Sequence, residues 1–257
     1  AHGLARRGLV DFLGMTVVAG NVGMDLTAKN ARIVCDWAGE EDFPVYAGAV
    51  KPLLRELETA EAVHGKTGLD GTELHEPSCP LQKQHAVAYL VETLSRAEDA
   101  SITLCPIGPL TNIALALSIA PEAVRAIKRI VLMGGNYFEA GNMTPAAEFN
   151  FFTDPHAAQI VLQSGAPITV LPLDVTHKAQ ITSERMNRLR RLKNANGSRL
   201  ADILQSYERF DIQQFGLEGG PLHDPCAVIC AVFPELFSGR MCRVDVETQS
   251  GLSTGAC

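Results

Sequence analysis

The sequence has 257 residues and a mass of 27.6 kDa, which suits one large α/β domain or two small ones. Hydrophobic residues make up 46% of it and charged residues 20%, a balance that supplies a core and excludes intrinsic disorder. The net charge of −7 argues against a nucleic-acid partner, and no apolar run approaches the roughly 18 residues of a membrane helix.

Strand-like and helix-like segments alternate from the start of the chain. In chain order we predict a buried strand at 13–19, a helix at 26–37, a strand at 43–47, a helix through 87–94 and a strand at 102–107. The helix through 87–94 carries apolar residues at i, i+3, i+4 and i+7. The stretch 51–80, rich in Gly, Pro and His, shows no clear pattern.

The alternation continues in the second half of the chain. We predict a helix at 113–117, a strand at 130–133, a helix that begins at Asp154-Pro155, a strand at 168–175, helices at 183–192 and 198–215, and a strand at 243–247. Apolar strands separated by helices indicate parallel β-α-β units. We therefore expect a single α/β domain over residues 1–257, with a doubly wound, mostly parallel sheet and helices on both faces.

Ligands of such a sheet bind beyond the carboxyl ends of its strands. Functional residues are therefore expected just after Ala19, Ile107, Met133 and Val175.

Seven cysteines are spread along the chain, an odd number with no C-x-x-C pair. Several of them, such as Cys105 and Cys230, lie in apolar runs, where a thiol acts as a small hydrophobic group. This usage favours a reducing compartment over a disulfide-bonded secreted protein. We expect a cytoplasmic protein.

The segment after the fourth predicted strand carries three polar side chains, Asn142, Glu148 and Asn150. An amide both donates and accepts hydrogen bonds, and a carboxylate accepts them, so the set suits a polyol with neighbouring hydroxyls. The alternative is turn chemistry, in which Asn150 and Asp154 cap local backbone groups.

His223 and Asp224 stand together in a glycine-rich loop before an apolar helical stretch. This pair suits a general acid beside a metal ligand, although helix capping by Asp224 is an equally good explanation. Upstream, Tyr207, Asp211 and Phe215 share one helical face that would point toward this loop, unless the stripe only packs.

Two further polar residues lie in turns. His64 stands in a loop with several glycines, a composition that suits a mobile flap closing over a substrate. Asn21 follows the first predicted strand. Each is also compatible with an exposed side chain without a role in binding.

Seven motifs together carry a resemblance that no single one would. In chain order they are Thr16-Val17-Val18-Ala19-Gly20-Asn21, Pro44-Val45-Tyr46-Ala47-Gly48, Val63-His64-Gly65, Gly108-Pro109-Leu110-Thr111-Asn112, Met133-Gly134-Gly135, Pro145-Ala146-Ala147-Glu148-Phe149-Asn150 and Pro221-Leu222-His223-Asp224. In this order, and over nearly the whole chain, the set strongly resembles the inosine-uridine nucleoside hydrolase family.

The resemblance implies a doubly wound α/β fold, hydrolysis of the N-glycosidic bond of ribonucleosides, a bound Ca²⁺ and a dimer or tetramer. It assigns His223 to the leaving base as an acid or polar contact, and His64 matches the flap histidine of the pyrimidine-preferring members. It assigns Ca²⁺ to Asp224 and the backbone carbonyl of Ile107. The residues it implies for the substrate are Asn21, Asn142, Glu148, Phe149, Asn150, Tyr207 and Asp211.

The sequence departs from the family in one respect. The Asp-x-Asp-x-x-x-Asp-Asp cluster that supplies the family's catalytic base and most metal ligands does not occur in it. Residues 1–13 resemble the segment after that cluster, and 255–257 fall inside a late strand. We therefore expect a chain that is incomplete at both ends and weak in hydrolysis, with a catalytically inactive nucleoside- or ribose-binding protein as the alternative.

Overall fold

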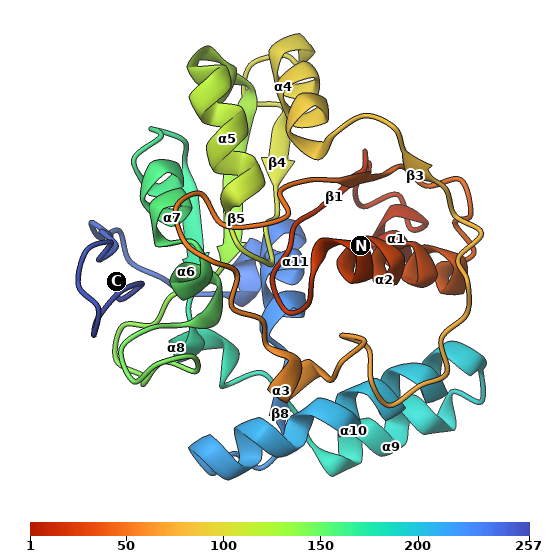
Figure 1. Cartoon of the computed structure of the whole chain (residues 1–257). Helices are drawn as coiled ribbons and strands as arrows, with labels where there is room; N and C mark the ends of the chain where they lie inside the picture. Colours follow the sequence, from red (N-terminus) through yellow and green to blue (C-terminus); the bar gives the residue numbers. More distant parts are fainter.

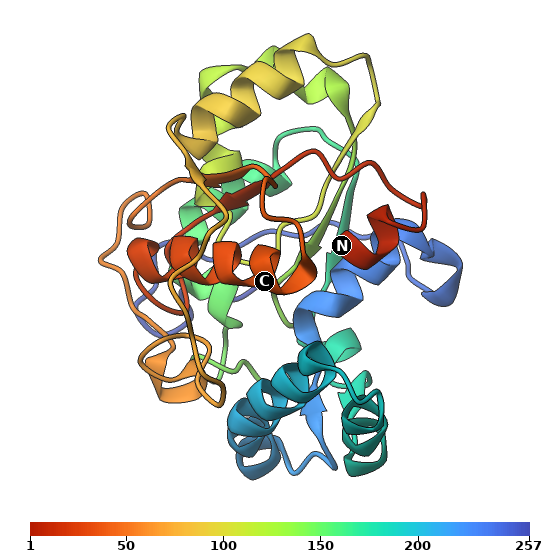
Figure 2. The same ribbon diagram turned by 90° about the vertical axis from the view of Figure 1, so that its right-hand side faces the viewer.

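The computed structural model describes the backbone of residues 1–257 and the side chains of 1–207, 212 and 215–257. Short parallel strands form two three-stranded sheets with helices packed around them, and a pair of helices lies apart from the sheets (Figures 1 and 2). Among the described residues, no helix combines the length and the apolar character needed to cross a membrane.

The first sheet is built from the amino-terminal third of the chain. Its order is β1-β2-β3, and all neighbouring strands are parallel. The strands are β1 (Met15–Val17), β2 (Val45–Ala47) and β3 (Leu81–Gln82), preceded by the short α1 (His2–Ala5) and connected in part by α2 (Met24–Ala38). Helix α2 ends at Gly39, whose φ of +69° is the left-handed conformation that glycine adopts most easily.

The second sheet has the order β4-β5-β6, again all parallel. Its strands are β4 (Ile102–Leu104), β5 (Ile127–Met133) and β6 (Ile168–Leu171). The helical segments between and before them are α4 (Ala86–Arg96), α5 (Thr111–Ile119), η1 (Pro121–Ala126), α6 (Phe149–Thr153) and α7 (Pro155–Leu162).

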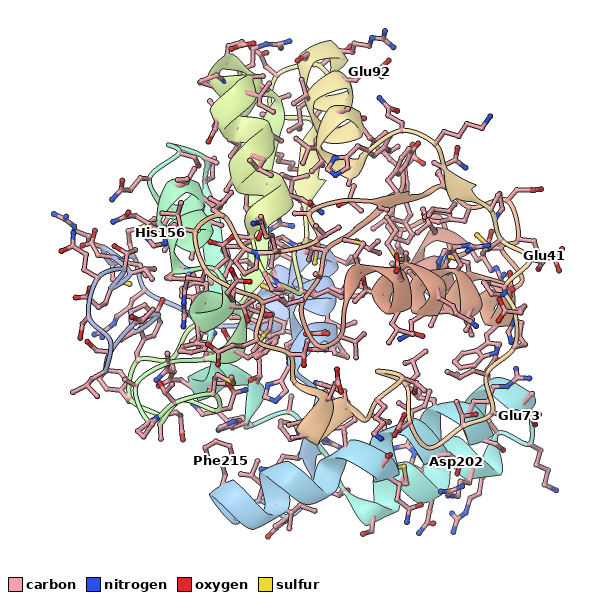
Figure 3. The ribbon with its side chains drawn as sticks, in the orientation of Figure 1. Glu41, Glu73, Glu92, His156, Asp202 and Phe215 are labelled. Carbon is pink, nitrogen blue, oxygen red and sulfur yellow. The ribbon has the colours of Figure 1, made fainter. Side chains whose placement is uncertain are left out.

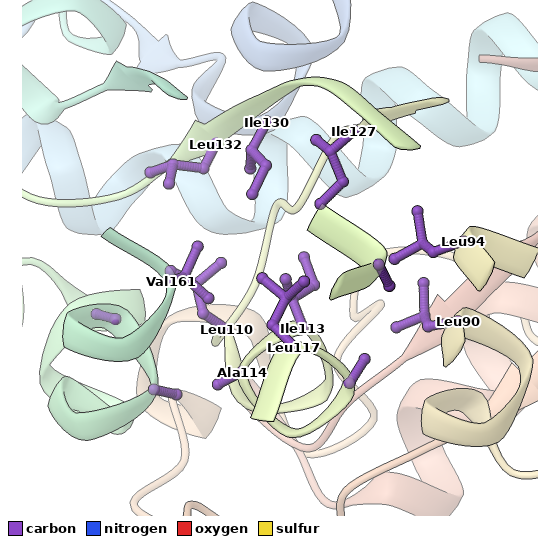
Figure 4. Close-up of a cluster of buried hydrophobic side chains, with 14 of the residues drawn as sticks. Leu90, Leu94, Leu110, Ile113, Ala114, Leu117, Ile127, Ile130, Leu132 and Val161 are labelled. Carbon is purple, nitrogen blue, oxygen red and sulfur yellow. The ribbon is translucent and has the colours of Figure 1, made fainter. Parts of the chain in front are cut away.

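Successive residues of β5 point to opposite faces of the second sheet. Ile130 and Leu132 join the large buried cluster formed with α4, α5 and α7 (Figure 4). Val131 and Met133 join a second cluster with α11 (His223–Val232). Helices thus cover both faces, as a doubly wound fold requires.

Two buried polar side chains tie the first sheet to the helices of the second. Asn112 accepts the backbone N–H of Ala49 at 2.8 Å and donates to the carbonyl of Val17 at 2.9 Å. Asp154 caps α7, as the sequence predicts, and also accepts the backbone N–H of Leu53 at 2.9 Å. These bonds fix the ends of β1 and β2 against α5 and α7.

The remaining elements include the pair of helices that lies apart from the sheets, α9 and α10. They are α3 (Glu61–His64), α8 (Leu173–Thr176), the antiparallel β7 (Gln180–Ile181) and β8 (Gly220–Pro221), α9 (Ser183–Arg191), α10 (Ala195–Phe215) and η2 (Pro234–Leu236). Helices α9 and α10 pack on each other, and α3 lies against α10 (Figure 1).

Most predicted elements are confirmed with bounds that differ by a few residues, and two predictions are wrong. The strand predicted at 168–175 ends at Leu171, because Pro172 begins the short helix α8. Residues 243–247 form no strand. The stretch without a clear pattern contains α3, and β3 was not predicted because two residues are too few to show a period.

Candidate functional site

Glu148 is the most enclosed carboxyl of the segment after β5, with 2% of its surface exposed. It caps α6, and its Oε2 accepts the backbone N–H groups of Gly135 at 3.0 Å and Phe151 at 3.2 Å. Burial raises the pKa of Glu148 to about 7, although these N–H groups favour the ionised form. A carboxylate fixed in this way presents its other oxygen in a set direction.

Positions 134 and 135, beside the side chain of Glu148, require glycine. A Cβ on Gly134 would lie 2.6 Å from the ring of Phe151, and Gly135 has a φ of +76°. The backbone therefore approaches Phe151 and Glu148 more closely than a residue with a side chain allows.

The side-chain amides of Asn142 and Asn150 each form a hydrogen bond to the backbone through one of their two polar groups. The Nδ2 of Asn150 donates to the carbonyl of Met133 at 3.0 Å, and the Oδ1 of Asn142 accepts the N–H of Phe149 at 2.9 Å. Of the two residues weighed for capping, Asp154 caps α7, whereas Asn150 donates to a strand carbonyl. Glu148 and Asn142 accept backbone N–H groups, which the sequence did not predict. These bonds do not exclude binding, because each side chain carries a second polar group.

The turns after three strands meet beside Phe149. A Cβ on Gly20 would lie 3.0 Å from Pro109 and 3.9 Å from the ring of Phe149. Asn21 follows Gly20, and its carbonyl accepts the N–H of Ala60 at 3.0 Å, just before α3. The carboxyl ends of β1, β4 and β5 therefore converge, as expected for a parallel sheet.

Helix α11 brings His223 and Asp224 toward the same region. The Nδ1 of His223 lies 2.8 Å from Oγ1 of Thr176, and burial lowers the pKa of His223 to about 3. Burial raises the pKa of Asp224 to about 7. The N-cap of α11 is Leu222 without a side-chain bond, so the capping explanation for Asp224 is wrong.

Helix α8 connects these two groups of residues. The N–H of Leu173 donates to the carbonyl of Gly135 at 3.0 Å, and Thr176 at the other end of α8 contacts His223. The charge of Asp224 also contributes to the raised pKa of Glu148, so the two carboxyls interact.

Aromatic rings from α3 and α10 complete the arrangement. The ring of His64 lies 6.0 Å from that of Tyr207, measured between centroids. Phe215, at the end of α10 (Figure 3), lies 4.7 Å from His177, whose ring is 5.8 Å from that of His223. The side chain of Asp211 is outside the described residues.

His177 was not identified from the sequence. It follows α8 by one residue, near the strand end after Val175 where functional residues were expected, but its position alone gave no sign of burial. In the structure it is 5% exposed and contacts both Phe215 and His223.

The residues assigned to Ca²⁺ supply few ligands. Calcium takes six to eight oxygens. Asp224 offers a carboxylate and Ile107 a backbone carbonyl, and within the described part of the chain no three or more His, Cys, Asp or Glu side chains form a metal-binding group. These residues do not fit a calcium site by themselves.

Comparison with known proteins gives consistent results. A family model described as inosine-uridine preferring nucleoside hydrolase matches residues 2–257. A pyrimidine-specific ribonucleoside hydrolase RihA of Shewanella sp. (strain MR-7) is 47% identical over 244 residues, which cover 95% of this chain and 76% of that protein. An uncharacterized protein of Schizosaccharomyces pombe, C1683.06c, is 48% identical over 246 residues, covering 96% and 79%.

Solved structures with the same fold are also similar in sequence. A purine-preferring ribonucleoside hydrolase from Gardnerella vaginalis superimposes with a TM-score of 0.90 and 31% identity, over 96% of this chain and 79% of the other. The plant nucleoside hydrolase PpNRh1 gives 0.89 and 30%, over 96% and 77%.

Proposed function

The chain belongs to the inosine-uridine preferring nucleoside hydrolase family, and we propose that its site binds a ribonucleoside whose N-glycosidic bond is hydrolysed to ribose and free base. The observation that carries the proposal is the connection through α8. Leu173 at its start donates to the carbonyl of Gly135, whose own N–H holds Glu148, and Thr176 at its end contacts His223. A pentose with an attached base has this combination of a polyol end and a heteroaromatic end.

The ribose is proposed to bind beside Glu148, Asn150 and Asn142, with Asn21 and Phe149 at the edge of the same pocket. A carboxylate accepts from hydroxyl groups, and the amides accept and donate, so two neighbouring hydroxyls find partners. Glu148 cannot turn away, because two backbone N–H groups hold its Oε2. A fixed sugar lowers the entropic cost of reaching the transition state.

Positive charge develops on the ribose as the N-glycosidic bond breaks. A carboxylate that is held in place before the reaction stabilises such charge without reorganising. Glu148 fits this role, because its position is set by the backbone of Gly135 and Phe151.

His223 is proposed to serve the leaving base. When the hydroxyl of Thr176 donates to Nδ1, the ring proton of His223 resides on Nε2, which then donates a hydrogen bond to the base. Because burial lowers the pKa of His223 to about 3, the ring is neutral near pH 7, and its proposed help is this hydrogen bond rather than transfer of a ring proton. His64 and Tyr207 would contact the base from α3 and α10.

We propose a pyrimidine nucleoside, such as uridine, as the substrate. The RihA relatives are named pyrimidine-specific, and His64 matches the flap histidine of pyrimidine-preferring members. The Gardnerella vaginalis structure is named purine-preferring, so inosine is the matching alternative in the test.

Ca²⁺ and assembly into a dimer or tetramer are proposed from the family resemblance alone, and a cytoplasmic location is proposed from the cysteine usage. A bound divalent cation would orient ribose hydroxyls and a water, with Asp224 and Ile107 among its ligands. Because the described residues fall short of a calcium site, we attribute no step to the ion. We expect the purified chain to bind Ca²⁺ with a dissociation constant above about 1 mM, which calorimetry would measure.

The test combines binding with product release. Uridine, inosine and ribose are titrated into the purified 257-residue chain by calorimetry, and release of free base is followed by chromatography. We expect binding of uridine with slow but measurable hydrolysis. Rapid base release would contradict the expected weak activity, binding without any release would favour the inactive nucleoside-binding alternative, and failure to bind all three would contradict the proposal.

A further inference from the structure

His177 is a buried histidine that follows α8 and lies beside His223. Its side chain is 5% exposed, and its Nδ1 lies 3.6 Å from Oε2 of Glu139. Its ring packs against Phe215 at 4.7 Å and stands edge-on to His223 at 5.8 Å. None of the seven sequence motifs includes it.

The Nε2 atom of His177 is shielded from solvent and has no hydrogen-bond partner among the described residues. Buried polar atoms of native proteins are nearly always hydrogen-bonded, and one that is not requires an explanation. A ligand group that bonds to Nε2 would supply the missing partner.

The surroundings of His177 also determine whether Nε2 needs a hydrogen-bond donor or an acceptor as its partner. Asp174 accepts the backbone N–H groups of Tyr137 and Phe138, at 2.8 Å each, and that of Glu139 at 3.3 Å, which fixes the loop that carries Glu139. Burial lowers the pKa of His177, so its ring is neutral near pH 7 even though Glu139 opposes this shift. A carboxylate beside Nδ1 favours the proton on that nitrogen, which leaves a lone pair on Nε2.

We propose that His177 is a base-recognition residue whose Nε2 accepts a hydrogen bond from an N–H group of the nucleobase, such as N3–H of uracil. The inference rests on the proposed function, because it requires a nucleoside beside His223. A base that reaches Nε2 has to move the ring of Phe215, which packs on His177. The ligand class is a nucleobase with a ring or exocyclic N–H donor.

The test compares two ligands that differ by this donor. Uridine, 3-methyluridine and ribose are titrated by calorimetry into the wild-type chain and into His177→Ala and Glu139→Gln. We expect the wild type to bind uridine about 3- to 10-fold more tightly than 3-methyluridine, the effect of one neutral hydrogen bond. In both variants this ratio should fall toward one, while the affinity for ribose stays unchanged.

His156→Ala is the matched control, because His156 is a partly buried histidine on α7 with a shielded, unpartnered ring nitrogen among the described residues (Figure 3). It should keep the wild-type ratio. Glu139 is half-exposed, so Glu139→Gln is expected to fold even where His177→Ala does not. An unchanged ratio in these variants, with the wild type binding uridine and ribose, would overturn the role of His177 alone. A wild type that binds neither ligand would overturn the proposed function as well.

Discussion

The two sides of the candidate site are built differently. The proposed sugar side rests on the loop after β5, where Glu148, Asn150 and Asn142 each bond to nearby backbone. The proposed base side is assembled from α3, α8, α10 and α11, whose side chains meet mainly through ring contacts. Hydrogen bonds to backbone fix a direction, whereas ring contacts tolerate small shifts. The ribose pocket should therefore be the rigid half, and the base pocket the half in which preference varies.

The largest effect is expected on the sugar side, from Glu148→Ala. The variant should lose more than tenfold in affinity for both ribose and uridine. It should also lose roughly 2–4 kcal/mol of stability, because the buried N–H groups of Gly135 and Phe151 lose their acceptor. Calorimetric titration and chemical denaturation measure the two effects. The control is Glu235→Ala at an exposed position, which should match the wild type in both.

Asn150→Ala should also weaken uridine binding at least tenfold, with a smaller loss of stability. The Nδ2 of Asn150 donates to the carbonyl and the sulfur of Met133, and the amide oxygen is proposed to face the sugar. Binding of uridine and ribose by calorimetry checks this. Near-wild-type affinity for ribose would contradict the placement of the sugar pocket.

His64→Ala should separate the two sides of the site. His64 contacts Tyr207 on α10, and its proposed role concerns the base alone. We expect uridine affinity to fall about 3- to 10-fold and ribose affinity to stay unchanged. An equal loss for both ligands would show that the two sides are coupled more tightly than their contacts indicate.

The last prediction concerns the pH dependence of stability. Burial raises the pKa of Glu148 from 4.5 to about 7, so the folded chain holds this proton more tightly than the unfolded chain. The resulting stabilisation is fully present below about pH 4.5 and is lost as the pH rises through about 7. Glu148→Gln removes this dependence, so the Tm of the variant relative to wild type should rise between pH 5 and 8. A Tm difference that is constant over this pH range would contradict the raised pKa of Glu148.

The alternation of strands and helices, the cap at Asp154 and the polar segment after the fourth strand could be predicted from the sequence, because each depends on a local pattern. The strand predicted through Val175 was wrong because of Pro172. The apolar run through Val175 suggested one strand, and the proline converts its end into α8, the helix that connects the two sides of the site.

What the sequence by itself determined is the alternation of strands and helices and the placement of polar residues after the strands. Only the tertiary structure decided which distant residues meet: Thr176 with His223, Asn112 with the ends of β1 and β2, and His177 with Phe215. These contacts join residues 38 to 95 positions apart. A periodic pattern reports the neighbours of a residue within one element, whereas burial and hydrogen-bond partners depend on how the elements pack.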